Sequence, residues 1–292
     1  MKMKLLLCVL IVVFMYPVNS SSFDKEENYI PGLFGYSENT WKSIIVELYT
    51  SGIASGYAPD KNSSAFVLRD GEFAMTASGI VMQGLSKKNY IITVSHSFTP
   101  THIRVDDCYT EVRKIQSRTI RVSGADEANI LWKEEKIDLA LLTTFDRNEF
   151  LKPSPFNATY TCVSGNEDYT LKPGDAVASI VGSRNKDGKR VSGLEIKRGK
   201  IISVEDLLKN NIVTEFFSEL DVVTNIDVWP GDSGSPVFAF RKGVPFLVGI
   251  MRAVIRKRDK ELQASYFVRI DPLITVFGPE NDIVGNWRKG CK

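Results

Sequence analysis

One segment late in the chain could hold a nucleophilic serine. Residues 230–236 read Pro-Gly-Asp-Ser-Gly-Ser-Pro and lie between two apolar runs, with Ser233 at the centre. Gly, Asp, Ser and Pro are also the residues that ordinary tight turns prefer, so this segment alone does not distinguish a nucleophile from a loop. A serine hydroxyl is a poor nucleophile at neutral pH and needs a general base within reach. Such a base must come from elsewhere in the chain.

Two other residues could complete a proton-transfer system with Ser233. His96 directly follows the strand-like run 90–94, and Asp138 stands at the head of the apolar run 139–142. Either residue alone would be an ordinary strand end or turn. Together, His96 could accept the serine proton and return it to a leaving amine, while Asp138 could fix the imidazole tautomer. The three residues occur in the order His, Asp, Ser, at separations of 42 and then 95 positions in the sequence.

The glycines of residues 230–236 have a role in the same chemistry. A sharp backbone turn would let the N–H groups of Gly231 and Ser233 converge on one point, where they could stabilise the oxyanion of a tetrahedral intermediate. Side chains at the glycines would crowd that approach. The sequence therefore predicts an oxyanion hole made from these two backbone N–H groups.

These segments resemble the chymotrypsin-like (trypsin-like) serine proteases, and especially their disulfide-poor bacterial and HtrA-like members. The order His, Asp, Ser is that of chymotrypsin and not that of subtilisin or the α/β-hydrolases. The resemblance extends over roughly residues 41–277 and rests on these segments: 77–82, 90–96, 137–142, 171–182, 198–203, 230–236 and 248–250. It implies a serine endopeptidase that acts on protein or peptide substrates through an acyl-enzyme, with no metal and no organic cofactor.

The resemblance also implies a fold. We expect an all-β protein of two antiparallel six-stranded β-barrels with a short C-terminal helix. Short runs rich in β-branched and aromatic residues, separated by turn residues, are consistent with this architecture. Helices are expected at residues 205–210 and 271–277, the latter with Asp271 as N-cap and Pro272 at the first helical position. The predicted domains are a signal peptide (1–20), a leader or surface strap (21–40), a first lobe (41–150), a linker (151–166) and a second lobe with the helix and tail (167–292).

Substrate selection is expected to involve two segments near Ser233. Counted back from Ser233, Asp227 falls where trypsin-like enzymes hold the acid that selects Arg or Lys at P1, the residue before the scissile bond. Ile250, Met251 and Arg252 lie on the expected substrate-lining strand. Arg252 could neutralise Asp227 or favour acidic side chains. The sequence thus favours a basic P1 residue, with a small or mixed preference as the alternative.

The activation route is left open by a departure from the family's pattern. In digestive and clotting members, a new Ile or Val terminus pairs with the aspartate before the serine, which is Asp232 here. No Ile-Val-Gly-Gly-like start is found in this chain. Asp232 could instead cap local backbone amides or pair with a basic residue elsewhere. The protein is then either active as soon as it is exported, or dependent on removal of residues 21–40.

Composition and the N-terminus bear on location and partners. The 292 residues carry a formal net charge of +2, which argues against a nucleic-acid partner. Lys2 and Lys4 precede an apolar run at 5–15, and small residues follow it, as in a secretory signal peptide. No later run approaches the roughly 20 apolar residues of a spanning helix. We expect a secreted or periplasmic protein with no stable membrane association once the signal is removed.

The cysteines and the remaining histidine complete the candidate residues. Cys108, Cys162 and Cys291 follow the signal and cannot all pair within one chain; a Cys162–Cys291 disulfide is one pairing that the sequence allows. Their spacing fits no zinc pattern, and His102 has no partner motif. Two rival functions remain: a non-catalytic, protease-like binding protein, and an esterase or narrowly specific toxin-like hydrolase with the same three residues.

Overall fold

The computed structural model describes most of the two predicted lobes. The described residues are 38–60, 63, 65–105, 108–123, 127–144, 151, 153–154, 171–185, 190–209, 218–241, 244–256, 263–278 and 281–284. The predicted signal peptide, nearly all of the leader, most of the linker, and both Cys162 and Cys291 lie outside them. Within the described residues Cys108 is a free, exposed thiol. Among the helices of these residues, none has the length and apolar character needed to cross a membrane.

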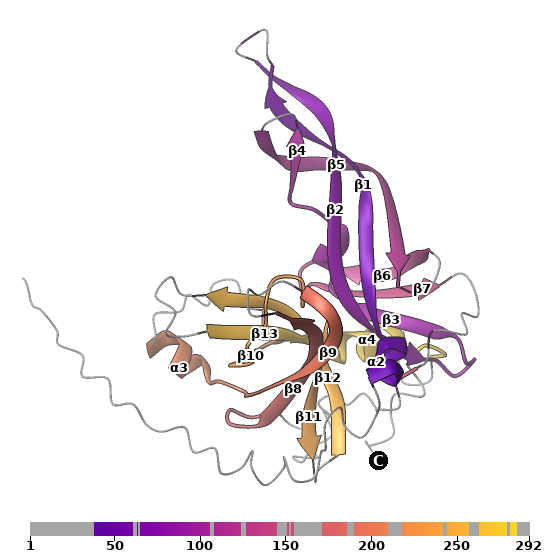
Figure 1. The fold of residues 1–292 in the computed structure, drawn as a ribbon, viewed down its shortest axis with the longest axis vertical. Helices are drawn as coiled ribbons and strands as arrows, with labels where there is room; N and C mark the ends of the chain where they lie inside the picture. Colours follow the sequence, from indigo (N-terminus) through magenta and orange to yellow (C-terminus); the bar gives the residue numbers. More distant parts are fainter. Residues whose placement is uncertain are drawn as a thin grey trace, which may run out of the picture.

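The first lobe is an antiparallel sheet of seven strands in the order β4-β5-β1-β2-β3-β7-β6 (Figure 1). A short helix, α2 (Glu38–Ile44), leads into it, and a 3-10 turn, η1 (Ser95–Phe98), follows β3. The strands are β1 (Ile45–Pro59), β2 (Phe66–Gln83), β3 (Asn89–Thr93), β4 (His102–Val105), β5 (Cys108–Val122), β6 (Ala128–Glu134) and β7 (Leu139–Thr144). The expected count of six was wrong for this lobe, because the short strand β4 pairs with the start of β5.

The second lobe is an antiparallel sheet of six strands in the order β10-β13-β12-β11-β8-β9. Its strands are β8 (Ala176–Arg184), β9 (Arg190–Lys200), β10 (Asp221–Thr224), β11 (Pro236–Arg241), β12 (Val244–Arg256) and β13 (Gln263–Arg269). Two helices, α3 (Val204–Lys209) and α4 (Asp271–Phe277), agree with the expected positions. The cap of α4 differs from the prediction, because Ile270 is the N-cap and Asp271 is already helical. The chymotrypsin-like double-barrel fold with a short C-terminal helix is confirmed.

Apolar side chains hold the two sheets against each other. One buried cluster joins Ile80, Ile92 and Leu141 of the first sheet to Phe238 and Ile250 of the second. Trp41, from the unpredicted helix α2, is fully buried in the same cluster, with its ring 6.0 Å from that of Phe238 in an edge-on contact. Each sheet also encloses a separate apolar cluster of its own. Because the shared cluster fixes one lobe on the other, residues from both can meet in a stable site.

Part of the first lobe extends away from this core. Strands β1 and β2 pair along their whole length, from Ile45 opposite Ile80 to Pro59 opposite Phe66. With β4 and β5 they form a long projection beyond the barrel (Figure 1). Strand β2 is continuous from Phe66 to Gln83, so segment 77–82, which carries part of the family resemblance, is only the barrel end of a much longer strand. The projection has a small apolar cluster of its own, which includes Ala54, Phe73 and Ile103.

Candidate active site

His96 is positioned by the end of strand β3. The chain leaves β3 and turns through η1, which places His96 at the edge of the first lobe. The His96 backbone N–H donates to Asp138 Oδ1 over 2.7 Å, and the ring Nδ1 lies 2.7 Å from Asp138 Oδ2. Two separate hydrogen bonds to one carboxylate therefore fix both the backbone and the ring of His96.

Asp138 is positioned by a tight turn between β6 and β7. Its φ is +56°, in the left-handed region that Asp tolerates better than most residues, and its N–H donates to the Glu135 carbonyl. The carboxylate is buried and accepts from four donors: the N–H and the ring of His96, Ser95 Oγ at 3.0 Å, and Arg252 Nε at 3.1 Å. Four donors match the roughly four acceptor positions of an ionised carboxylate.

These donors decide the charge of Asp138. Burial by itself would raise the pKa of the Asp138 carboxyl, but the hydrogen bonds and charge of His96 and the charge of Arg252 lower that pKa below its usual range. An ionised carboxylate can only accept hydrogen bonds, so Nδ1 of neutral His96 must carry the proton. Nε2 is then the basic nitrogen, free to take a proton on the side of the ring away from Asp138.

The Ser233 loop comes from the second lobe and contacts the first. The Ser233 carbonyl accepts from the Ser78 N–H of β2 over 2.8 Å. Gly234 has φ +88°, and a Cβ there would lie 1.8 Å from the Ser78 carbonyl oxygen, so only glycine fits. Gly231 is constrained differently: its φ is +94°, but a Cβ there would make only an ordinary contact with Arg184 Nη2, at 3.8 Å. The sequence argument from crowding thus applies to Gly234, whereas Gly231 is required by its backbone angle.

A buried ion pair between Asp232 and Arg184 also fixes the Ser233 loop. The Asp232 side chain is 1% exposed; Oδ1 accepts from Arg184 Nη2 over 2.9 Å, and Oδ2 accepts from the Trp229 N–H over 2.8 Å. Arg184 also donates to the Pro230 carbonyl, and its guanidinium lies over the Trp229 ring. Both of the roles considered for Asp232, as an amide cap and as an ion-pair partner, are present together.

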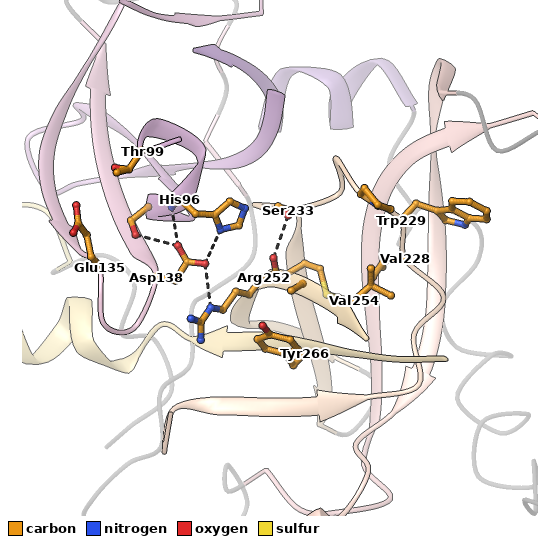
Figure 2. Close-up of a pocket in the computed structure, with 14 residues that line it drawn as sticks. His96, Thr99, Glu135, Asp138, Val228, Trp229, Ser233, Arg252, Val254 and Tyr266 are labelled. Atoms are coloured by element: carbon orange, nitrogen blue, oxygen red, sulfur yellow. Dashed lines mark hydrogen bonds and ion pairs between the residues drawn. The ribbon is translucent and has the colours of Figure 1, made fainter. Parts of the chain in front are cut away.

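Ser233 and His96 face one cavity between the lobes (Figure 2). The cavity has a volume of about 540 Å³, and Asp138, Trp229, and Arg252 also line it. In the described part of the chain, the Ser233 hydroxyl donates to the Arg252 carbonyl over 3.1 Å and not to the His96 ring. The hydroxyl must therefore change its partner from the Arg252 carbonyl to His96 Nε2 before it can transfer its proton.

Arg252 occupies a different place from either one considered in the sequence. Its guanidinium contacts Asp138 on one side and Asp221 on the other, and it lies over the Tyr266 ring at 5.5 Å. Asp227, in contrast, is exposed and lies off the cavity wall. Arg252 therefore does not neutralise Asp227, and Asp227 does not supply an acid inside this cavity.

The other predicted substrate-lining residues divide between wall and core. Met251 is buried and lines the cavity, whereas Ile250 belongs to the apolar cluster between the two sheets. Val228, Val254 and Tyr266 also line the cavity, which makes this end of it largely apolar. Two charged residues were missed in the sequence: Arg184 and Asp221. No local motif marks either, because each meets its partner only through the folded sheet.

Comparison with known families agrees with this geometry. A family model described as a trypsin-like peptidase domain matches residues 77–250, more than half of the chain. The matched range begins in β2 and ends in β12, and so includes His96, Asp138 and Ser233. A comparison with curated proteins finds no significant match. The chain belongs to the trypsin-like peptidase family and is a chymotrypsin-like serine endopeptidase.

Proposed function

We propose that the protein hydrolyses peptide bonds with Ser233 as nucleophile, His96 as general base and acid, and Asp138 as the group that orients His96. The observation that supports this most directly is the 2.7 Å contact between His96 Nδ1 and an ionised, buried Asp138 in the cavity that Ser233 lines. Ser233 Oγ attacks the carbonyl carbon while its proton passes to His96 Nε2. His96 then protonates the leaving amine. In the second half of the reaction, water gives a proton to His96 and attacks the acyl-enzyme carbonyl, and His96 returns the proton to Ser233 Oγ as the acid product leaves.

The developing oxyanion would be bound by the backbone N–H groups of Gly231 and Ser233. The positive φ of Gly231 and the Asp232–Arg184 ion pair hold this loop in a turned conformation. One such donor contributes roughly 3–4 kcal/mol to the stabilisation of a comparable transition state. Because Asp232 already has a basic partner within the chain, no new N-terminus is needed to hold the loop. We therefore infer that the protein is active without an activation cleavage.

The cavity beside Ser233 suggests the side chain accepted before the scissile bond. Its far wall is formed by Val228, Val254 and Tyr266, with Met251 at the side. Arg252 also lines it, but its guanidinium already has two carboxylate partners. Without an uncompensated charge on this wall, a charged side chain would be desolvated without a partner, at a cost of several kcal/mol. We propose a preference for uncharged, apolar P1 residues over the Arg or Lys that Asp227 would select.

Export remains part of the proposal. The charged start, the apolar run at 5–15 and the small residues that follow support secretion or delivery to a periplasm. A protein or peptide substrate outside the cytoplasm is the corresponding partner.

The activated serine can be tested with a fluorophosphonate probe on the purified mature protein. We expect rapid labelling that is abolished in Ser233→Ala and reduced by roughly 10⁴-fold or more in His96→Ala, because only a serine with a general base reacts at neutral pH. Ser235→Ala and His102→Ala are matched controls. Ser235 is buried two residues away and His102 is exposed on β4, so labelling should persist in both.

The substrate class needs a second measurement. Peptide-library cleavage that depends on Ser233 and prefers apolar P1 residues would agree with the proposal, and strong selection for Arg or Lys would contradict the P1 preference. Hydrolysis of small activated esters but of no peptide would identify an esterase-like enzyme instead. No labelling and no hydrolysis would favour the binding-protein alternative, in which the Ser233 hydroxyl keeps the Arg252 carbonyl as its partner.

A further inference from the structure

Three charged side chains continue the line from His96 into the second lobe. Asp138 Oδ2 accepts from His96 Nδ1 and also from Arg252 Nε, over 2.7 and 3.1 Å. Nη1 of the same arginine donates to both carboxylate oxygens of Asp221, over 3.0 and 2.8 Å. Figure 2 shows the first part of this line, with Arg252 reaching across to Asp138 from below the cavity. The charges therefore alternate: negative, positive, negative.

The fold places Arg252 in this line by means of an irregularity. Strand β12 pairs Met251 with Phe267 and Ala253 with Tyr266, so Arg252 is the extra residue of a β-bulge. A bulge turns a side chain away from the direction that regular alternation would give it. Here the turned side chain rests on the Tyr266 ring of β13 and points across the interface between the lobes. Asp221, on β10, lies two strands away in the same sheet.

Burial makes these contacts matter energetically. The side chains of Asp138, Arg252 and Asp221 are 6%, 18% and 0% exposed. Asp221 is further fixed by the Ser218 N–H, which donates to its Oδ2 over 2.7 Å. Charges this well shielded from water interact far more strongly than surface pairs. With His96 neutral, the three groups carry a net charge of −1, the same as an isolated catalytic aspartate would.

We propose that Arg252, held by Asp221, is a positioning residue that acts through Asp138: it fixes the Asp138 carboxylate against His96 and sets the pH above which the enzyme works. This inference rests on the proposed function of His96 and Ser233. The positive charge of Arg252 disfavours the protonated form of His96, and the negative charge of Asp221 partly cancels this effect. The charges of Arg252 and Asp221 together therefore determine how readily the His96 imidazolium forms during catalysis.

Other charged or titratable groups around Asp138 do not replace this pair. His96 and Ser95 face it from η1, Tyr266 lies beneath Arg252 on β13, and Glu135 lines the same cavity from the preceding turn. Burial by itself would lower the pKa of Arg252, but the charges of Asp221 and Asp138 raise it above its ordinary value. The same burial raises the pKa of Tyr266. Both groups therefore keep one charge state throughout the working range of a histidine-dependent enzyme.

The test is the pH dependence of kcat/KM in three variants that change the charge balance. The acid limb of this profile is the range in which activity falls because His96 becomes protonated. Arg252→Gln leaves two carboxylates near His96 and favours its protonated form, so the acid limb should move up by about one pH unit. Asp221→Asn leaves Arg252 unbalanced, so the acid limb should move down by a similar amount. The double variant restores the net charge of −1, and its acid limb should return to the wild-type pH while kcat stays about tenfold lower, because the carboxylate is no longer held. KM should change little.

Two control substitutions distinguish a positioning role of Arg252 from a general loss of structure: one keeps the charge at this position, and the other removes an arginine far from the site. Arg252→Lys keeps the charge, so its acid limb should stay at the wild-type pH with part of the kcat recovered. Arg69→Gln removes an arginine that pairs with Asp60 at the outer end of the projection, and it should change neither quantity. Arg252→Gln leaves Asp221 buried without its charge partner and could unfold. The double variant removes both charges and provides the folded comparison.

A second readout does not require activity. NMR titration of the His96 ring in a Ser233→Ala background follows the ionisation directly, and the only other histidine signal belongs to His102. Opposite shifts in the two single variants, with cancellation in the double variant, are the expected result. Midpoints that coincide in all four proteins would overturn the inference, even if fluorophosphonate labelling confirms Ser233. Conversely, opposite shifts in a protein that the probe never labels would uphold the charge balance and reject the proposed function.

Discussion

Two buried aspartates near Ser233 each pair with an arginine, but the two carboxylates face different groups. Asp232 and Arg184 are 1% and 13% exposed at the side chain, and this pair also binds the Trp229 N–H and the Pro230 carbonyl, with the Arg184 guanidinium over the Trp229 ring. Asp138 and Arg252 are 6% and 18% exposed, and this pair faces the His96 ring. Similar pairs can therefore serve different purposes: one fixes the backbone of a loop, and the other controls a charge that takes part in the reaction.

The largest effect is expected on the side of His96. Asp138→Asn should lower kcat by roughly 10⁴-fold, because an amide at this position can present an N–H to Nδ1 and so stabilise the wrong imidazole tautomer. Asn is the suitable replacement because it also tolerates the φ of +56°. Steady-state kinetics on a peptide substrate measures the effect. A loss below about tenfold would mean that Asp138 only supports the fold and that the two pairs do not differ as argued.

A smaller effect is expected on the side of the loop. Arg184→Gln should lower kcat by roughly 10²–10³-fold, the loss typical of one misplaced oxyanion donor, with the pH profile unchanged. Breaking a buried pair should also lower the free energy of unfolding by about 3 kcal/mol. The double variant Arg184→Gln with Asp232→Asn should recover most of that stability but little of the activity. A shifted pH profile in either variant would show that this pair also controls charge.

The pairs should also differ in how stability depends on pH. The hydrogen bonds and charge of His96, together with the charge of Arg252, outweigh burial and hold the pKa of Asp138 in the folded protein below the ordinary value of an aspartate. A carboxyl of this kind stabilises the fold above its unfolded pKa, and the contribution is lost as the pH falls toward the folded value. Denaturant unfolding of the wild type between about pH 5 and 2 should therefore lose stability more steeply than that of Asp138→Asn. Parallel curves for the two proteins would show that the ionised Asp138 does not favour folding.

The sequence predicted the catalytic candidates better than the charges that support them. His96 and Asp138 adjoin strands whose apolar runs are visible in the sequence, and the Ser233 loop has a recognisable composition. Arg252 sits in a β-bulge, and its partner Asp221 lies two strands away. Regular alternation cannot predict where a bulged side chain points. The direction of Arg252 therefore became clear only from the structure.

The same limit explains the remaining differences. The placement of Asp227 relied on counting back from Ser233 along a loop, and one residue of slip moves a side chain from the cavity to solvent. Trp41 lies in the short helix α2, which is not among the helices expected from the sequence, and it is fully buried. Packing against Phe238 of the other lobe is a tertiary contact that local sequence does not reveal. Element types were thus predictable where periodicity decides them, and not where distant contacts do.

The smallest effect is expected when the N-terminal segment is shortened. A chain that begins at residue 38 retains α2, whose Trp41 packs between the lobes, and retains the Arg184 partner of Asp232. Its kcat/KM should lie within about twofold of that of a chain beginning at residue 21, because neither buried pair uses a chain terminus. Comparing the two purified forms on one peptide substrate tests this. If kcat/KM rose tenfold or more when residues 21–37 were removed, the Asp232–Arg184 pair alone would not hold the oxyanion hole in place, and the N-terminal segment would control activity.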